Sequence, residues 1–238
     1  MALVTLAPGV HRIPTMGDFI NSFVFAEDDG SVTLVDCGVK RAPRRIVAAL
    51  AAMGRHPQDV QRIVLTHAHA DHAGGAAELV AGTAVAGVSA HADDVASLES
   101  GTAPVQATSP IMKTYLRMVG GHFAPVPVEQ VLHDGDVLPM AGGVRVLHTP
   151  GHTPGHVSLL HETTGVLITG DAIWNMRSRI GWPVAAFCTS APLNARSAAI
   201  FADLDYRIAA FTHGPEIRDN AREQVRDFLR RKRPEAAS

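Results

Sequence analysis

One stretch of the chain reads Thr66-His67-Ala68-His69-Ala70-Asp71-His72-Ala73-Gly74-Gly75, and it places four metal-capable side chains within six residues. The four preceding residues, 62–65, are typical of a buried strand because two of them are β-branched and none forms turns. Residues 73–81 are rich in Ala, Glu and Leu and predict the start of a helix. The cluster is therefore expected on a turn between a strand and a helix, where a rigid scaffold can aim several side chains at one point.

A structural explanation accounts for only part of this cluster. Asp71 can cap the helix that is expected from Ala73. Capping gives no reason for the three neighbouring imidazoles of His67, His69 and His72. Imidazoles and carboxylates at such close spacing are typical of a metal site, so metal binding is the working hypothesis.

The cluster resembles the His-x-His-x-Asp-His signature of the metallo-β-lactamase superfamily. The family pattern continues with a His in a Gly-His-Thr-Pro-Gly-His-like turn, an Asp after a small apolar strand, and a late His. The chain carries, in the same order, Thr149-Pro150-Gly151-His152-Thr153-Pro154-Gly155-His156, then Leu167-Ile168-Thr169-Gly170-Asp171, then Phe211-Thr212-His213-Gly214. The resemblance spans nearly the whole chain, and an ordered set of motifs is far more specific than one short motif.

Length and composition favour a globular protein with a sizeable core. The chain has 238 residues, 46% of them hydrophobic, which suits one large domain over 1–238. A net charge of −2 gives no electrostatic footprint for nucleic acid, and no stretch approaches the ~20 apolar residues of a membrane span. The N-terminus shows no signal peptide, and the two cysteines form no spaced motif, so a cytoplasmic location is expected. Monomer and homodimer both remain open.

Strands predominate early and then alternate with helices. Strands are predicted at 3–6, 10–13, 20–26, 31–36, 62–65, 84–88, 129–132, 144–148, 156–161, 166–169 and 207–212. Helices are predicted at 43–53, from 73, and at 91–99, 111–118, 194–204 and 217–231. Two mixed sheets packed face to face with helices outside would bury this α+β pattern, and the resemblance implies the same four-layer αββα sandwich, with metals at one edge.

The resemblance also implies a set of seven metal ligands. A first ion would be held by His67, His69 and His152. A second ion would be held by Asp71, His72 and His213, and Asp171 would bridge the two ions. Histidine and carboxylate without cysteine suits Zn²⁺ best, with Mn²⁺ and Fe²⁺ possible. Two cations about 3.5–4 Å apart can generate a bridging hydroxide near neutral pH, so hydrolysis is the expected reaction, with Asp71 and Asp171 as its catalytic carboxylates.

Residues near the seven expected ligands can either support the metal site or serve the fold. Asp36 ends a predicted strand, and we expect it to support a metal ligand rather than only form a turn. His156 is expected to support the site or the fold, since His152 occupies the better-matched place. The remaining histidines lack a partner pattern or lie in strand-like segments, and none is assigned a role: His11, His56, His91, His122, His133, His148 and His161.

The substrate is less well defined than the reaction. Trp174 and Trp182 follow Asp171 closely and either form an apolar wall near the site or fill the core. Acyl-homoserine lactonases of this superfamily usually carry a Tyr shortly after the bridging Asp, and the corresponding neighbourhood of this chain has Trp174. Residues 108–120 are a possible lid, in which Met112 and Tyr115 would supply adaptable contacts, or an ordinary connector.

Three functions are compatible with these motifs. The first is a dinuclear zinc hydrolase acting on a small ester, lactone, thioester or amide. The second is a mononuclear iron persulfide dioxygenase, which would need only the first three histidines. The third is a non-catalytic metal-binding regulatory protein. The complete set of seven ligands favours the hydrolase.

Overall fold

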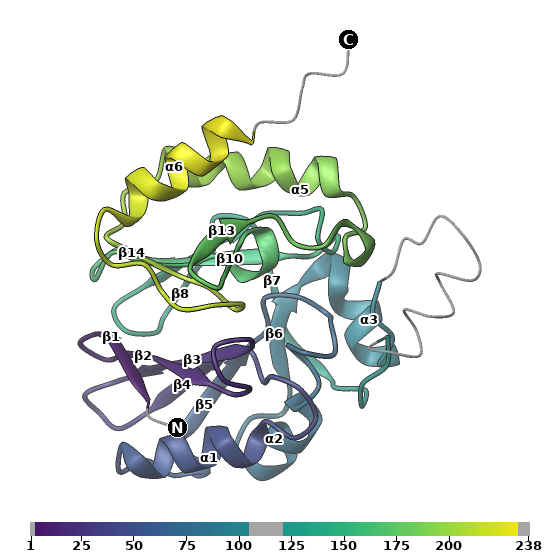
Figure 1. The fold of residues 1–238 in the computed structure, drawn as a ribbon. Coiled ribbons are helices and arrows are strands. Elements are labelled where there is room, and N and C mark those ends of the chain that lie inside the picture. The colour runs from purple at the N-terminus through teal and green to yellow at the C-terminus, as the bar shows by residue number, and fades with distance from the viewer. Residues whose placement is uncertain (1–2, 105–120, 233–238) are drawn as a thin grey trace.

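The computed structural model describes residues 3–104 and 121–232. Two β-sheets pack face to face, and helices cover the outer face of each sheet (Figure 1). The layers therefore follow the order helix, sheet, sheet, helix, which is the α+β sandwich expected from the sequence. The predicted lid at 108–120, with Met112 and Tyr115, lies outside the described residues.

The first sheet holds seven strands in their chain order. The first four strands pair antiparallel and the next three join in parallel. Their bounds are β1 (Val4–Ala7), β2 (Val10–Pro14), β3 (Asn21–Ala26), β4 (Val32–Val35), β5 (Val60–Val64), β6 (Val88–His91) and β7 (Val128–Leu132). The parallel half places the carboxyl ends of β4, β5 and β6 at one edge of the sheet.

The second sheet holds five strands in the order β14-β11-β10-β9-β8. Their bounds are β8 (Val137–Leu138), β9 (Val144–His148), β10 (Val157–His161), β11 (Val166–Ile168) and β14 (Ile208–Ala210). Strand β10 runs antiparallel to β9 and β11, while β11 and β14 are parallel, so β9, β11 and β14 share one direction. A separate hairpin is formed by β12 (Trp174–Met176) and β13 (Arg179–Gly181).

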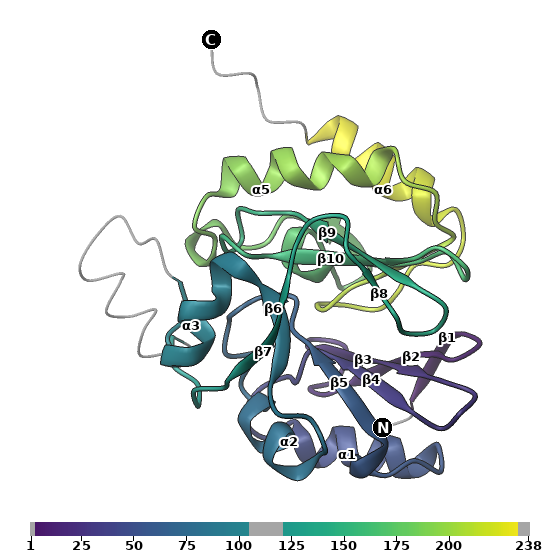
Figure 2. The ribbon, with the colours of Figure 1, turned by 180° about the vertical axis from the view of Figure 1, so that it is seen from behind.

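Five α-helices and five 3₁₀ turns complete the described part of the chain. The α-helices are α1 (Pro43–Ala52) and α2 (Ala76–Gly82) on the first sheet, α3 (Val95–Ser100) beside β7, and α5 (Ala191–Ser197) and α6 (Ala221–Arg231) on the second sheet (Figures 1 and 2). The 3₁₀ turns are η1 (Pro57–Asp59), η2 (Ala92–Asp94), η3 (Gly170–Ala172), η4 (Ala185–Phe187) and η5 (Ala198–Ala202).

Alternation along β3 shows how the layers are held together. Phe23 and Phe25 are fully buried between the two sheets, whereas Val24 points to the opposite face and packs in the layer beneath α1 and α2. The period of two in a strand produces this division. A third apolar cluster, which includes Phe201 and Phe228, fills the space between the second sheet and its helices.

Several element boundaries differ from the sequence-based expectation. Helix α2 begins at Ala76 rather than Ala73, and it follows two glycines packed against neighbouring backbone, where a Cβ on Gly74 would meet Ala70 O at 2.1 Å. Strand β6 occupies Val88–His91 instead of 84–88, and the helix predicted at 91–99 is a 3₁₀ turn followed by α3. The last helix starts at Ala221 instead of residue 217, after Asn220 adopts a left-handed conformation with φ 51°. The short strands β8, β12 and β13 were not predicted.

The helices and the two cysteines can also be compared with the sequence-based expectations. Within residues 3–104 and 121–232, no helix combines the length and the apolar character needed to cross a membrane. Both cysteines, Cys37 and Cys188, are buried and free.

The packing between the sheets predicts that two phenylalanines contribute very differently to the free energy of unfolding. Replacing Phe25, which is fully buried, by Ala should lower the free energy of unfolding by about 3–5 kcal/mol, because it leaves a cavity in the core between the sheets. Replacing Phe187, which is 43% exposed, should change it by no more than about 0.5 kcal/mol. Urea unfolding followed by circular dichroism measures both, and equal losses would contradict the assigned core.

Candidate metal centre

The seven predicted ligands lie at the carboxyl ends of four strands. His67, His69, Asp71 and His72 are on the loop after β5, and the other three follow strands of the second sheet: His152 after β9, Asp171 after β11 and His213 after β14. Because β9, β11 and β14 run in the same direction, their carboxyl ends meet at one edge. The backbone N–H of Val157 donates to Thr66 O (2.8 Å) and joins the end of β5 to this edge.

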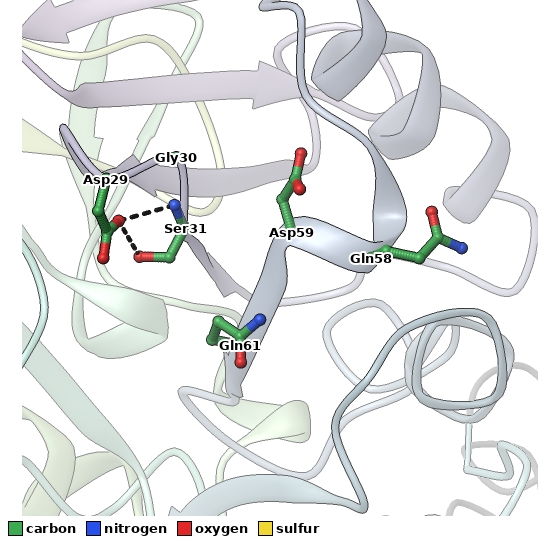
Figure 3. Close-up of a pocket in the computed structure, with 6 residues that line it drawn as sticks. All are labelled: Asp29, Gly30, Ser31, Gln58, Asp59 and Gln61. Carbon is green, nitrogen blue, oxygen red and sulfur yellow. Dashed lines mark hydrogen bonds between the residues drawn. The ribbon is translucent and has the colours of Figure 1, made fainter.

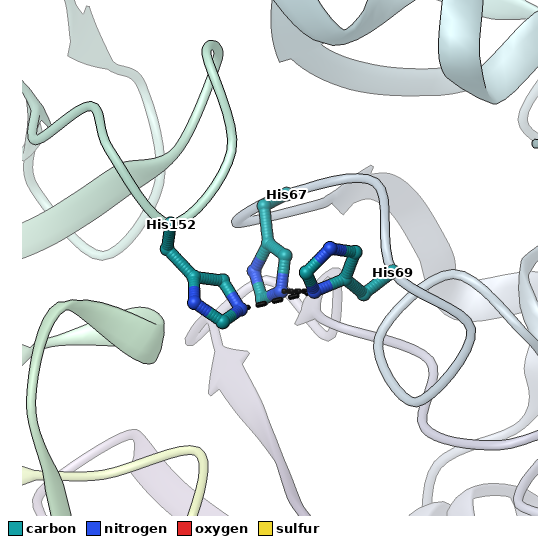
Figure 4. A group of neighbouring side chains, drawn as sticks. All are labelled: His67, His69 and His152. Carbon is teal, nitrogen blue, oxygen red and sulfur yellow. Dashed lines mark hydrogen bonds between the residues drawn. The ribbon is translucent and has the colours of Figure 1, made fainter. Parts of the chain in front are cut away.

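Three imidazoles form a first group. His67 and His69 approach from one loop and His152 from another, with their rings turned toward one another (Figure 4). The Nδ1 atom of His69 lies 3.2 Å from His67 Nε2 and 3.0 Å from His152 Nε2. Ligand atoms on a tetrahedral zinc ion with bonds of about 2.0–2.1 Å are about 3.3 Å apart, so these spacings suit one bound ion.

The second group consists of Asp71, His72 and His213. The Oδ2 atom of Asp71 lies 3.3 Å from His213 Nε2 and 3.8 Å from His72 Nε2. Asp171 stands between the two groups: its Oδ2 is 3.2 Å from His152 Nε2 and 3.3 Å from His213 Nε2. One carboxylate therefore faces ligands of both groups.

Buried hydrogen bonds hold the histidines in orientation. His72 Nδ1 donates to Asp36 Oδ2 (2.8 Å), and Thr66 donates to the same carboxylate through its N–H and its hydroxyl. His213 Nδ1 donates to Phe19 O at 2.6 Å. In both cases the bond fixes which ring nitrogen faces the site, as the partners of metal-bound histidines do. The structure thus places Asp36 against a predicted ligand, and its backbone is in a left-handed conformation with φ 59°.

His156 positions Asp171 and does not face the site with a free nitrogen. Its Nδ1 donates to Thr149 O (3.0 Å), and its Nε2 accepts the backbone N–H of Asp171 (2.8 Å). Gly170 is required beside it, because a Cβ there would lie 2.4 Å from His156 Nε2 and the residue has φ 54°. Asp171 also accepts a hydrogen bond from the Thr212 hydroxyl at 2.6 Å.

Asp94 is a functional residue that the sequence analysis missed. Its buried carboxylate accepts hydrogen bonds from Ala68 N (2.8 Å), Thr153 Oγ1 (2.7 Å) and Gly155 N (2.8 Å). It therefore ties the loop that carries His67 to the loop that carries His152. Local sequence shows only two acidic residues before a helix, which is an ordinary pattern, so only the tertiary contacts identify this role.

Two buried nitrogens support the fit of a cation at this centre. The Nε2 atoms of His72 and His213 have no hydrogen-bond partner in the described part of the chain, although carboxylate oxygens lie within 3.4 Å of each. Buried polar atoms are rarely left without partners. A divalent ion would satisfy both nitrogens, and no other described group does.

The electrostatics of the two groups differ. Burial lowers the pKa of His69 to about 3, with His152 adding to the effect, and burial also lowers the pKa of His67 well below its ordinary value. Burial opposes charge on His213 too, but Asp171 and Asp71 outweigh it and raise its pKa to about 10. His67 and His69 therefore offer neutral imidazoles, the form that binds metal, while the carboxylates beside His213 give a negative potential that attracts a cation.

The two tryptophans lie in different surroundings. The Trp174 ring is 4.5 Å from that of His213, so it borders the centre. Trp182 packs against Phe228 of α6, with 4.8 Å between ring centroids. Trp182 therefore packs against the cluster beside α6, as in the core-filling alternative for this residue, while Trp174 is the tryptophan that borders the centre.

A hollow on the molecule lies away from this centre. It has a volume of about 450 Å³ and is formed where the turn between β3 and β4 meets the start of β5 (Figure 3). The lining is polar and consists of Asp29, Gly30, Ser31, Gln58, Asp59 and Gln61. Since the predicted ligands follow the carboxyl end of β5, the hollow occupies the opposite edge of the sheet and takes no part in the metal centre.

Comparison with known proteins assigns a family. The family model that describes the metallo-beta-lactamase superfamily matches residues 15–236 of this chain. A probable metallo-hydrolase of Bacillus subtilis (strain 168) is 28% identical over 193 residues, which is 81% of this chain and 80% of that protein. An N-acyl homoserine lactonase of a Bacillus species is 34% identical over 131 residues, or 54% of this chain and 44% of the lactonase.

Solved structures share the fold. A metallo-beta-lactamase family protein from Thermus thermophilus matches with a TM-score of 0.69 and 27% identity, covering 95% of this chain and 80% of that one.

Removing the hydrogen-bonding carboxylate that orients one ligand group should lower the metal affinity of that group and not of the other. Asp36→Ala leaves His72 Nδ1 without its acceptor, so metal affinity of the second group should fall by about 10–100-fold. Asp94→Ala should instead weaken the first group, because it frees both loops that carry it. Competition with a chromophoric chelator measures the two affinities. An exposed carboxylate variant, Asp205→Ala, is the control, and a loss equal to the control in either variant would contradict the assigned support.

Proposed function

Because this chain belongs to the metallo-β-lactamase superfamily and is a metal-dependent hydrolase, we propose that it uses two zinc ions to hydrolyse a small ester, lactone, thioester or amide. The observation that carries the proposal is the position of Asp171, whose Oδ2 lies 3.2 Å from one ligand group and 3.3 Å from the other. Seven donors exceed what one tetrahedral zinc ion needs, and a carboxylate shared by both groups is suited to bridging two ions.

The chemistry divides between the ions and the side chains that hold them. Bound divalent ions supply Lewis acidity and a water of lowered pKa. Asp171 is buried and hydrogen-bonded to Thr212 and His156, so it is held rigidly between the groups. The side chain of Asp71 is 35% exposed, against 2% for Asp171. Asp71 is therefore the carboxylate of the centre that a substrate can reach.

An acyl compound with an apolar portion is the substrate class that the surroundings favour. Trp174 offers an aromatic face next to His213. Its indole N–H is buried and has no hydrogen-bond partner within the described residues, so the ring face rather than the N–H is the part offered to a substrate. The lactonase relative is named for action on an N-acyl homoserine lactone. We therefore include lactones among the proposed substrates, without restricting them to N-acyl homoserine lactones.

Two alternatives make different demands on the site. A mononuclear iron dioxygenase needs only the group formed by His67, His69 and His152, and leaves the convergence of Asp71, His72 and His213 without a purpose. A non-catalytic metal-binding protein would be free to lose ligands, and none of the seven is missing from this chain. The second donor group therefore favours the dinuclear hydrolase over both alternatives.

Metal content tests the proposal directly. Elemental analysis of the purified protein should find about two zinc ions per chain, and His72→Ala or His213→Ala should each reduce this to about one, since each removes a donor of the second group. His56→Ala, at an exposed histidine outside the centre, should leave the content unchanged. About one iron per chain in the wild type would support the dioxygenase, and two ions retained in both variants would contradict the ligand assignment.

The two tryptophans should separate substrate binding from packing. Trp174→Ala should change KM or kcat for apolar lactones and esters by about 10-fold, because it removes apolar contact area beside the centre. Trp182→Ala should lower the free energy of unfolding through loss of its contact with Phe228, while KM stays near the wild-type value. Kinetics on a panel of lactones, esters and thioesters, together with urea unfolding, would compare them. Unchanged kinetics in the Trp174 variant for every hydrolysed substrate would remove it from the proposed pocket.

A further inference from the structure

A second cluster of metal-capable side chains lies outside the seven ligands. His91 ends β6, Asp93 lies in η2, and His148 ends β9. One donor atom from each lies within 4.8 Å of the other two. The rings of His91 and His148 are stacked, with 3.8 Å between centroids and 14° between planes. The cluster thus joins a strand of the first sheet to a strand of the second.

The hydrogen bonds of His148 leave one nitrogen available. Its Nε2 donates to Pro154 O at 2.9 Å, so Nδ1 carries the lone pair. A backbone carbonyl that accepts the N–H of one nitrogen is the usual partner of a metal-bound histidine, and His213 is held in the same way by Phe19 O. His148 therefore keeps Nδ1 free, and a rotation of one ring out of the stack would let His91 and His148 bind the same ion.

His91 offers its Nδ1 atom on the side of Asp93. The Oδ2 atom of Asp93 is 3.8 Å from this nitrogen, and the Asp93 N–H approaches it at 3.3 Å, a long hydrogen bond that an ion can replace. His91 is 8% exposed, and burial lowers its pKa, with His148 adding to the effect, so the imidazole is neutral near pH 7.

We propose that His91, Asp93 and His148 bind a further divalent transition-metal ion, of which Zn²⁺ is the expected case. Two imidazoles and one carboxylate are borderline donors that suit Zn²⁺, Cu²⁺ or Ni²⁺, whereas Mg²⁺ and Ca²⁺ prefer oxygen ligands. The carboxylate of Asp93 is 57% exposed, so water completes the coordination. This site is separate from the proposed catalytic pair and shares no ligand with it.

Charges around the cluster favour a cation. Besides Asp93, the carboxylate of Asp134 acts on His91, and its Oδ1 accepts the backbone N–H of His148 at 2.8 Å. His133 is the other titratable group that acts on His91, and its ring lies 3.7 Å from Asp136, so a carboxylate offsets its charge when it is protonated.

An ion at this site would add a further link between the two sheets, next to the loops that carry His67 and His152. Asp93 is adjacent to Asp94, whose carboxylate ties the loops of His67 and His152 together, and His148 is held by Pro154 from the second of these loops. Binding would therefore raise the thermal stability of the protein by linkage, since the unfolded chain does not bring these three residues together.

The test is zinc binding to the holoenzyme at equilibrium. Wild-type protein already loaded with its tightly bound zinc is dialysed against micromolar buffered zinc, and metal per chain and Tm are measured. We expect one additional ion and a higher Tm. Asp93→Asn and His148→Ala should each lose that ion and the rise in Tm, while the tightly bound zinc and the hydrolytic activity stay at the wild-type level. His133→Ala, which removes a neighbouring histidine outside the donor set, is the matched control and should keep the additional ion.

Two outcomes would overturn the assignment. One is a wild-type protein that takes up no ion beyond its tightly bound zinc. The other is an additional ion that persists in both Asp93→Asn and His148→Ala, which would mean that it binds elsewhere. The result is independent of the proposed catalytic function: if that function fails, the tightly bound zinc or the activity of the wild type is affected, whereas the difference between wild type and the two variants remains.

Discussion

The hydrogen bond from Val157 N–H to Thr66 O joins the strand ends of two different sheets at the point where the first histidines begin. Asp94 reinforces the same joint, because its carboxylate accepts from Ala68 on one side and from Thr153 and Gly155 on the other. Metal ligands must be held to within a fraction of an ångström to bind one ion well. A joint between the sheets is therefore a precondition for a centre whose ligands come from both.

The centre brings imidazoles and carboxylates into close contact at a largely buried place. His67, His69 and His152 bring three imidazoles together, while Asp71 and Asp171 place two carboxylates beside them. Burial alone would penalise these charges, and the surrounding hydrogen bonds only orient the side chains. The apolar core between the sheets, with large buried side chains such as Phe23 and Phe25 on β3, offsets part of this cost.

The fold was predictable because its periodic patterns lie in local sequence, and the ligand set was expected because contiguous motifs resemble those of the metallo-β-lactamase superfamily. The alternation in β3 and the apolar stripe of α1 each follow from neighbours a few residues apart, and the motif at residues 66–75 is contiguous. Boundaries were less accurate where tertiary contacts surround them, as at Gly74 and Gly75, which pack against other backbone just before α2 begins.

Residues that act through distant partners could not be identified in this way. The role of Asp94 depends on Thr153 and Gly155, which lie about 60 positions later in the chain. Trp174 and Trp182 look alike in sequence, yet β12 and β13 direct one toward His213 and the other toward Phe228. Likewise, His91 and His148 become neighbours only when β6 and β9 are brought together by the packing of the two sheets.

The distribution of ligands along the chain has a consequence for biosynthesis. Residues 67–72 leave the ribosome well before His152, Asp171 and His213, since synthesis proceeds from the N-terminus. An ion captured early would meet an incomplete coordination sphere on a sheet that lacks its packing partner. Full coordination arises only when the second half of the chain docks, so secure retention of metal marks the completion of folding.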